Sequence, residues 1–366
     1  MLHEQPHASV TGPSATATLA IIIISYNVRE LLRACLAATL ASLARSPELA
    51  ATIWVVDNAS ADSSAQMVAR EFPQVHLIAS SVNLGFARSN NLVLQELGLG
   101  RQPSEAPPED ELAVKSASPR RAAPELILLL NPDTEPLGDA IGQMAAFMRE
   151  HPAVGGVGPY LLYPDGRFQH SAFRFPDLWQ LWFDFFPPRP RRLLESRLNG
   201  RYPRALYEAG KPFPVDFVLG AALMVRRPAI EAAGLLDEGY FMYAEEVDWC
   251  WRIQRAGWPF YCVPAARVIH HGGASARQFR AQSFTNLWQS RYRLYSRFYN
   301  WPRRWLAAQM VRLGMWAEVR RARAEAVRGQ ISPDELAERT AAARQIATLF
   351  RHGIAREQGN TSKHRV

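Results

Sequence analysis

Residues 126–136, LILLLNPDTEP, place five consecutive apolar residues directly before a polar turn that holds two prolines. A short apolar run without polar alternation is typical of a strand buried on both faces, as at the centre of an α/β sheet. Pro132 and Pro136 have no ladder N–H, so we expect the strand to end at Leu130. Asp133 would then lie at the carboxyl end of a central strand, where open α/β sheets bind ligands. A turn aspartate that accepts backbone hydrogen bonds would also explain this residue.

Apolar runs and helical spacings alternate on both sides of this stretch. The runs predict strands at 19–24, 53–56, 75–79, 217–226 and 261–269. The spacings predict helices at 28–43, 63–72, 137–149, 228–234 and 244–256, and one that ends near residue 97. Strands that alternate with helices imply right-handed crossovers and a mostly parallel sheet, so the predicted fold class is α/β. Residues 160–207 show no pattern that assigns them.

The 366 residues suggest about two domains, or one large domain with an appendage. We expect a disordered tail at 1–18, a main domain at 19–275 and, within it, a mobile surface insertion at 98–124. A helical extension rich in Arg and Trp would follow at 276–353, with a second tail at 354–366.

The net charge of +8 comes almost entirely from arginine, because the chain has only three lysines. Arginine suits phosphate recognition and anionic membrane surfaces. Three cysteines without a CxxC pair argue against a disulfide framework or a zinc site and favour a reduced, cytoplasmic setting. The tail at 1–18 lacks the pattern of a secretory signal, and the run at 19–24 is too short to span a bilayer.

Polar side chains follow several predicted strands, among them Asn27, Asp57, Asn83, Arg88 and Asp133. Together they predict a polar crevice along one edge of a parallel sheet, where a nucleotide would bind. The chain has neither GxGxxG after the first strand nor a Walker A lysine, which argues against a dinucleotide enzyme and a P-loop NTPase. A diphosphate without a glycine cradle needs another positive charge, and a divalent metal held by Asp133 would supply it.

The sequence EEVDWCWR at 245–252 opens a predicted helix with three carboxylates. Acids in a first turn stabilise a helix by ~0.3–1 kcal/mol, and Asp248 has the spacing to pair with Arg252. Alternatively, carboxylates that cannot all ionise cheaply raise one pKa, as a general base near neutrality requires. The helix amino end acts in the opposite sense, so both interpretations stay open.

The sequence HHGGAS at 270–275 follows the last predicted strand. Adjacent histidines project to opposite faces of an extended chain, so only one of them can reach a shared site. Gly272 and Gly273 would let the backbone approach a phosphate or a metal closely. A structural histidine is the alternative.

Several motifs, in this order, resemble those of the family 2 inverting glycosyltransferases: residues 21–27, 55–60, 83–91, 128–134, 220–225, 241–248 and 270–275. The closest branch is similar to bacterial rhamnosyltransferases of surface polysaccharide synthesis, and the resemblance spans residues 20–275. It implies the GT-A fold, in which a Rossmann-like, mostly parallel sheet flanked by helices binds the nucleotide and merges with an acceptor-binding half. The predicted main domain would be this GT-A unit, followed by the helical extension.

The resemblance assigns the donor site. Asp57 would read the nucleobase, and Ser25, Tyr26, Asn27 and Arg88 would line the nucleoside pocket. Donor-binding roles also fall on Asn83 and Asn131.

The resemblance also assigns the metal and the base. Asp133 occupies the metal position, with Asn131 where many members have a second acid. His270 matches the histidine that joins the metal, Mg²⁺ or Mn²⁺, to the diphosphate, and His271 is the alternative. Glu246 falls where the catalytic base is usually Asp, with Glu245 and Asp248 as rivals.

The implied function is metal-dependent, inverting transfer of a sugar, with rhamnose a candidate, of the hexosyltransferase type. The donor would be a dTDP- or UDP-sugar, and the acceptor a glycan or a lipid-linked hydroxyl. One alternative is an inactive relative that only binds nucleotide sugars. Another is a sugar-1-phosphate nucleotidyltransferase, although residues 25–27 lack the glycine-rich loop of those enzymes. The basic residues do not form a known nucleic-acid-binding pattern, so no nucleic-acid partner is expected.

Aromatic residues interleave with arginine between Trp288 and Trp316. This composition predicts a peripheral contact with the anionic inner face of the cell membrane, near a lipid-linked acceptor. Helices that pack on the catalytic domain, with arginine outward, would give the same composition.

Overall fold

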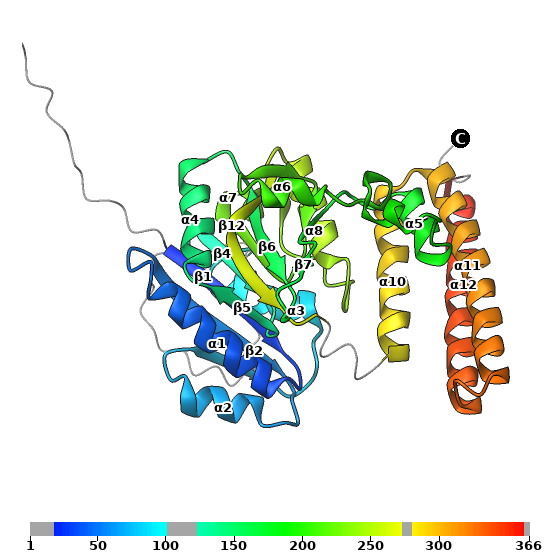
Figure 1. The fold of residues 1–366 in the computed structure, drawn as a ribbon, viewed down its shortest axis with the longest axis horizontal. Coiled ribbons are helices and arrows are strands. Elements are labelled where there is room, and N and C mark those ends of the chain that lie inside the picture. The colour runs from blue at the N-terminus through cyan, green and yellow to red at the C-terminus, as the bar shows by residue number, and fades with distance from the viewer. Residues whose placement is uncertain (1–17, 101–122, 273–279, 362–366) are drawn as a thin grey trace, which may run out of the picture.

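The computed structural model describes residues 18–100, 123–272 and 280–361 (Figure 1). Almost all of the predicted amino-terminal tail and most of the insertion at 98–124 lie outside these ranges, as do the last three residues of the motif at 270–275. The three cysteines are buried thiols without disulfide bonds.

A ten-stranded sheet forms the centre of the fold, with its main strands in the order β3-β2-β1-β4-β11-β6-β12-β5. The first four are parallel to one another, and β12 is parallel to β6, whereas β11 and β5 run antiparallel to their neighbours. The bounds are β1 (Thr18–Ser25), β2 (Ala50–Asn58), β3 (His76–Ser80), β4 (Leu126–Leu130), β5 (Thr134–Leu137), β6 (Gly156–Leu162), β11 (Ala222–Arg226) and β12 (Phe260–His270).

Helices cover both faces of this sheet. Alternate residues of β1 enter two separate cores: Ile21 and Ile23 pack with α1, α2 and α4, and Ile22 and Ile24 pack with α3, α7 and α8. This double burial explains the unbroken apolar runs of β1 and β4. The helices are α1 (Arg29–Leu43), α2 (Ser64–Glu71), α3 (Phe86–Glu96), α4 (Ala140–Glu150), α7 (Arg227–Ala233) and α8 (Glu245–Arg255). The structure thus confirms the α/β class and the mostly parallel sheet expected of a GT-A fold.

Two boundaries differ from the predicted ones. Pro136 lies inside strand β5, opposite Val268 of β12, and not in a turn. The sheet tolerates this proline because β5 is an edge strand, where one side needs no ladder N–H. The predicted strand at 217–226 is two strands, β10 (Phe217–Val218) and β11, separated by residues that line a cavity.

The stretch at 160–207 consists of elements too short to show a period. They are β7 (Phe168–Gln169), β8 (Ala172–Phe173), α5 (Leu178–Phe185), η1 (Arg191–Glu195), η2 (Arg197–Asn199) and α6 (Arg204–Glu208), followed by β9 (Phe213–Val215). Packed aromatic rings hold them together; the rings of Phe168 and Tyr207, for example, meet edge to face at 4.9 Å.

Three long helices follow the sheet: α10 (Arg280–Phe298), α11 (Trp301–Val327) and α12 (Pro333–Thr361). Figure 1 shows them side by side next to the sheet. Trp251 of α8 stacks between Phe175 and Phe298 with both ring centroids at 4.3 Å, so α10 packs on the sheet domain. Helix α12 continues to Thr361, into the range 354–366 that was predicted to be a tail. The division of the chain into domains remains a prediction.

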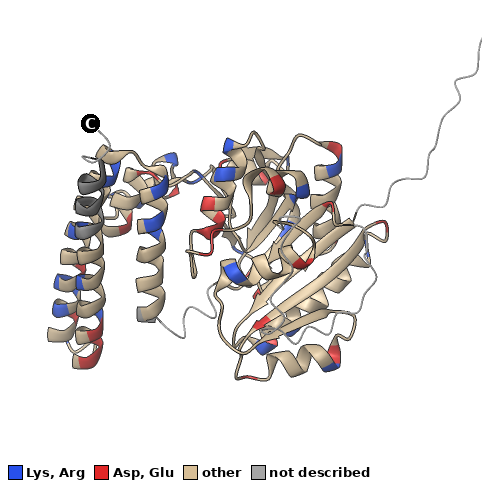
Figure 2. Cartoon of the chain, turned by 180° about the vertical axis from the view of Figure 1, so that it is seen from behind, with Lys and Arg blue, Asp and Glu red and all other residues tan. Residues whose placement is uncertain are grey.

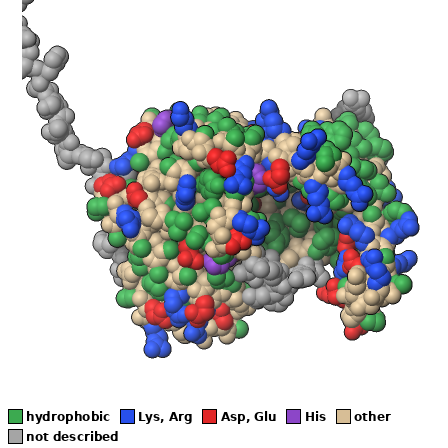
Figure 3. All heavy atoms as spheres, viewed as in Figure 1, with side chains coloured by type: hydrophobic (Ala, Val, Ile, Leu, Met, Phe, Trp, Pro, Cys, Tyr) green, Lys and Arg blue, Asp and Glu red, His purple; other side chains and the backbone are tan. Residues whose placement is uncertain are grey.

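Within the described ranges, no helix is both long and apolar enough to cross a membrane. Figure 3 shows basic side chains over the C-terminal helices and a hollow with hydrophobic side chains between these helices and the sheet.

Candidate active site

A cavity of about 270 Å³ opens at the carboxyl ends of β1 and β4. Parallel strands end at the same edge of a sheet, which is why polar residues far apart in the chain meet there. Eight of the predicted site residues line it: Ser25, Tyr26, Asn83, Asn131, Asp133, Glu245, Glu246 and His270.

Strand pairing brings Asp133 and His270 together. His270 pairs with Thr134 at the start of β5, and the N–H of His271 donates to the carbonyl of Asp133 at 2.9 Å. The Thr134 hydroxyl closes the turn by donating to the carbonyl of Asn131 at 2.7 Å. As a result, Asp133 Oδ1 lies 3.5 Å from His270 Nε2, and both side chains are almost fully buried.

The second ring nitrogen of His270 fixes its orientation. Nδ1 lies 3.2 Å from Oε1 of Gln169, a residue of β7 that was not among the predicted site residues. When Nδ1–H donates to this amide oxygen, Nε2 turns its lone pair toward Asp133, the arrangement that metal-binding histidines adopt. His271 points elsewhere, with Nε2 at 2.7 Å from Glu135, and it does not line the cavity.

These residues fit a divalent cation that shares its ligands with a substrate. Among the residues that the structure describes, no three His, Cys, Asp or Glu side chains gather closely enough to hold a metal by themselves. The protein ligands of an ion at this position would therefore be the carboxylate of Asp133 and the imidazole of His270. Mg²⁺ is commonly held by one or two carboxylates together with substrate phosphates, so this incomplete set suits a nucleotide-bound ion.

A strained turn places Glu245 and Glu246 at the cavity. Tyr243 and Ala244 adopt left-handed backbone angles, φ 71° and 64°, directly before α8 begins. The loop is anchored because the N–H of Phe86 donates to the carbonyl of Phe241 at 2.9 Å. Gly85 is required beside it, since a Cβ there would lie 2.4 Å from that carbonyl oxygen.

Burial raises the pKa of both glutamates. For Glu245 the charge on Glu246 raises the pKa further, well above its ordinary value. For Glu246, burial outweighs backbone hydrogen bonds that act in the opposite direction, including one at Gly220. In each carboxyl group, Oε2 is buried and has no hydrogen-bond partner within the described chain. Of the two effects that the sequence left open, desolvation therefore exceeds the helix amino end.

Asp248, the third candidate base, does not line the cavity. It is fully buried, bonded to Arg252 Nε at 2.6 Å, and it lies 3.2 Å from Arg297 Nη1 and from the Tyr240 hydroxyl. These partners make Asp248 part of the link between α8 and α10. The structure thus favours the helical pairing with Arg252 that the spacing suggested.

Three residues predicted for the nucleoside pocket, Asn27, Asp57 and Arg88, do not line the cavity. Asp57 accepts from the N–H of Ser60 at 3.0 Å through Oδ2, and its buried Oδ1 has no partner within the described chain. Asn27 accepts from the N–H of Ala61 at 2.7 Å, and Arg88 is exposed on α3. Asn58, which does line the cavity, was missed although it follows Asp57 directly.

Comparisons with known proteins relate the chain to one family. The model of "Glycosyl transferase family 2" matches residues 20–97. The chain is 30% identical over 237 residues, 63% of its length and 70% of the relative's, to the N-acetylglucosaminyl-diphospho-decaprenol L-rhamnosyltransferase of Mycobacterium tuberculosis. It is 34% identical over 83 residues, 23% of its length and 31% of the relative's, to the rhamnosyltransferase WbbL of Escherichia coli. A solved mannosyltransferase from Pyrobaculum calidifontis, in complex with GDP-Man and Mn²⁺, has a TM-score of 0.49 and 16% identity, and the match covers 95% of this chain and 88% of that one.

Proposed function

This chain belongs to glycosyl transferase family 2, and on that premise we propose that it transfers a sugar from a nucleoside diphosphate to an acceptor hydroxyl with inversion at the anomeric carbon. The observation that carries the proposal is one cavity lined both by Asp133 with His270 and by two glutamates of raised pKa. An enzyme of this kind needs a diphosphate site and a proton acceptor on opposite sides of the reacting carbon, and one cavity lined by both sets of side chains supports these roles.

The donor would bind along the carboxyl ends of the strands. Asp57 Oδ1 is a buried acceptor without a partner within the described chain, which suits an N–H of the nucleobase. Asp133 and His270 would hold Mg²⁺ or Mn²⁺ at the diphosphate. When bound, such an ion offsets the negative charge that develops on the leaving nucleoside diphosphate.

Glu246 would act as the general base. Its carboxylate takes the proton of the acceptor hydroxyl while the hydroxyl oxygen forms a bond to the anomeric carbon. The bond from that carbon to the phosphate oxygen breaks, and the nucleoside diphosphate leaves with the electron pair. Since attack and departure occur on opposite faces, the configuration inverts without a covalent enzyme intermediate. The negative charge of an ionised Glu246 raises the pKa of Glu245, so Glu245 would keep its proton while Glu246 is ionised.

The names of the relatives motivate the finer assignment. A rhamnosyltransferase that acts on N-acetylglucosaminyl-diphospho-decaprenol is 30% identical over 63% of this chain. We therefore propose a dTDP- or UDP-sugar as donor, with rhamnose as the first sugar to test. The acceptor would be a glycan or lipid-linked sugar used for the cell envelope.

Thermal unfolding in the presence of nucleotide sugars tests this proposal. At ~100 times Kd a ligand stabilises the folded state by ~2.7 kcal/mol, which is roughly 5 °C in Tm for a protein of this size. We expect such a shift with a dTDP- or UDP-sugar and Mn²⁺ or Mg²⁺, and a smaller one with EDTA. Equal shifts with ATP or NAD, or no shift with any nucleotide sugar, would contradict the proposed function.

A peripheral position on the inner membrane face is the second part of the proposal. The aromatic residues predicted to contact lipid divide into two groups. Those of α10, such as Trp288 and Tyr295, are buried, and so is Tyr299 directly after this helix. Trp288 packs against Phe185 of α5 and Phe350 of α12. Those of α11 are exposed: Trp301, Trp305 and Trp316 show 48%, 46% and 56% of their surface.

The exposed residues of α11 form one face. Trp301, Trp305, Arg312, Trp316 and Arg320 follow at spacings of four, seven, four and four, and the buried residues lie on the opposite side. Between residues 301 and 317 the helix has no Asp or Glu. Figure 2 shows that basic residues recur along these C-terminal helices. Tryptophan beside arginine suits the interface of an anionic bilayer.

Flotation with vesicles tests the membrane contact. Full-length protein should float with phosphatidylglycerol vesicles, and the triple variant Trp301→Ala, Trp305→Ala, Trp316→Ala should partition at least about tenfold less, since it loses the apolar area that inserts. Trp179→Ala is the matched control, because Trp179 of α5 is 58% exposed but lies outside this face. Equal flotation of the triple variant and the wild type would rule out the α11 face.

A further inference from the structure

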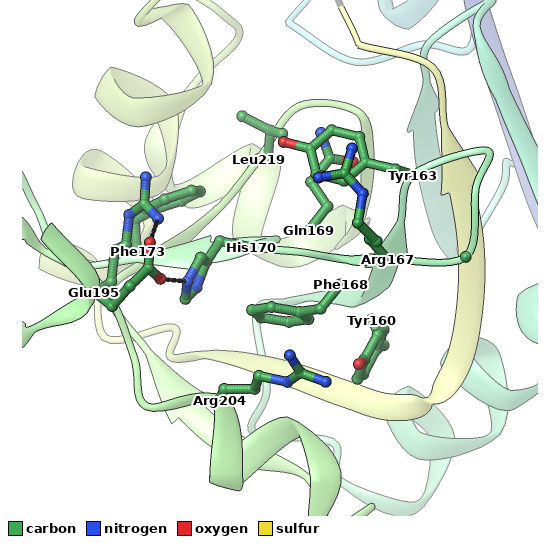
Figure 4. A pocket seen from close by; sticks show the side chains of 12 residues that line it. Tyr160, Tyr163, Arg167, Phe168, Gln169, His170, Phe173, Glu195, Arg204 and Leu219 are labelled. Carbon is green, nitrogen blue, oxygen red and sulfur yellow. Dashed lines mark hydrogen bonds and ion pairs between the residues drawn. The ribbon is translucent and has the colours of Figure 1, made fainter. Parts of the chain in front are cut away.

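A second and larger cavity, of about 780 Å³, lies beside the first (Figure 4). It is built by β6, β7 and β8 together with residues of η1 and α6. Leu219 lines both cavities. Gln169, which lines the second cavity, reaches His270 of the first with its Oε1 at 3.2 Å from Nδ1. The two cavities are therefore neighbours that meet at Leu219.

Three arginines, Arg167, Arg201 and Arg204, and one carboxylate, Glu195, line the second cavity. Each arginine is also paired with a carboxylate, so the local charges nearly balance. Burial lowers the pKa of His170 despite its hydrogen bond to Glu195, so the imidazole adds no charge near neutral pH. Guanidinium groups that line a cavity suit an anionic ligand through the N–H donors that their ion pairs leave over.

Two of these arginines each form one ion pair and still have donors to offer. Arg167 donates through Nε to Asp165 at 2.6 Å, and Arg204 donates through Nε to Glu208 at 2.7 Å. In the described chain these bonds leave the terminal amino groups of both guanidinium forks for a ligand. Such a fork matches two oxygens of one phosphate. Figure 4 shows Arg167 and Arg204 on either side of Phe168.

Aromatic rings form the rest of the wall. Phe168 and Tyr160 meet edge to face at 5.3 Å, and the Arg204 guanidinium lies 5.5 Å from the centre of the Phe168 ring. An aromatic face beside fixed polar groups suits a ligand that has both an apolar ring face and hydroxyl groups. A pyranose sugar has this character. His170 and Glu195, 2.7 Å apart, add a hydrogen-bonding pair at the same wall.

We propose that this second cavity binds the acceptor, and that it recognises a sugar carrying a phosphate or diphosphate on its anomeric oxygen. The aromatic wall would hold the sugar ring, and Arg167 and Arg204 would hold the phosphate. The shared residue Leu219 would let a sugar hydroxyl reach the glutamates of the first cavity. This inference rests on the proposed function, because it presupposes a donor in the first cavity.

Isothermal titration of the full chain with N-acetylglucosamine 1-phosphate, with UDP or dTDP and Mn²⁺ present, tests the inference. We expect binding that weakens at least about tenfold in the double variant Arg167→Gln, Arg204→Gln, since both fork contacts are lost. Both arginines are exposed at the surface, so the fold should tolerate the change. Arg255→Gln is the matched control, because Arg255 is an exposed arginine beside an aromatic ring, that of Trp251, outside the cavity.

Two further ligands separate the contributions of the anion and the sugar. The neutral methyl glycoside of N-acetylglucosamine should bind at least about tenfold more weakly than the 1-phosphate. Inorganic pyrophosphate should also bind more weakly, because it has no ring to pack on Phe168. Equal affinity for the methyl glycoside, equal affinity for pyrophosphate, or unchanged binding by the double variant would overturn the inference.

Donor binding provides the separate readout. If nucleotide sugars raise the Tm of the wild type and of the double variant alike while the 1-phosphate does not bind, the acceptor inference fails and the proposed function stands. If nucleotide sugars leave the Tm of the wild type unchanged, the proposed function itself fails.

Discussion

Replacing Glu246 by glutamine should lower the rate of sugar transfer by ~10²–10⁴ and leave donor affinity unchanged. Glutamine has nearly the same shape but cannot accept the proton of an acceptor hydroxyl. The residue is half-buried at the cavity wall next to Gly220, and the amide should fit there without displacing the backbone. Turnover with an acceptor and donor titration by calorimetry would measure the two effects separately.

Glu245→Gln is the matched control for this substitution. The charge on Glu246 raises the pKa of Glu245, so Glu245 stays protonated when Glu246 has ionised. Glutamine imitates a protonated carboxyl group, and transfer by this variant should remain within about tenfold of the wild type. If Glu246→Gln turned over at a near-normal rate and Glu245→Gln did not, the roles of the two residues would be reversed.

The pH dependence of transfer follows from the same carboxyl group. Burial raises the pKa of Glu246, so the group holds its proton to a higher pH than an exposed glutamate, whose pKa is 4.5. The basic form is therefore lost as pH falls through the raised pKa. The acid limb of the rate profile should lie above pH 4.5, and it should disappear from the residual activity of Glu246→Gln.

The sheet was predictable because its strands are buried on both faces. The sequences of such strands are unbroken apolar runs, as at 126–130 and 19–24. Each of these runs forms a strand in the structure. The prediction that Pro136 lies outside any strand was wrong, because a proline is excluded only from central strands. Strand β5, which contains Pro136, lies at the edge of the sheet. Whether a strand is central or at an edge depends on pairing with β12, more than 120 residues away.

Strand ends predicted a polar edge of the sheet that includes Asp133, since parallel strands end at one edge. Only the family resemblance brought His270 and Glu246 to the same site. The orientation of the helix α8 was not predictable. Asp248 lies in the same helical turn as the two glutamates, and either face of the turn could have met the cavity. In the structure Asp248 faces α10, where it lies 3.2 Å from Arg297. This contact joins segments that no local sequence pattern connects. Gln169 could not be predicted either, because its strand has only two residues and is too short to show a sequence pattern.

Removing the carboxylate of Asp133 should abolish the effect of a divalent metal on donor binding. In Asp133→Ala the Kd for a dTDP- or UDP-sugar in the presence of Mn²⁺ should rise at least about 10²-fold, to the value measured with EDTA. The reason is that Asp133 is the carboxylate beside His270, and the described residues hold no cluster of three His, Cys, Asp or Glu side chains that could bind the metal without it.

Two variants separate a metal ligand from a residue that merely lies nearby. His271→Ala should leave donor affinity unchanged, because this imidazole faces Glu135 and not the cavity. Gln169→Leu should weaken Mn²⁺ binding by ~10–100-fold, since it removes the hydrogen bond that orients His270. Direct Mn²⁺ titration followed by electron paramagnetic resonance, with the nucleotide present, measures both without an activity assay. A wild-type donor affinity that is the same with Mn²⁺ and with EDTA would exclude the metal role of Asp133.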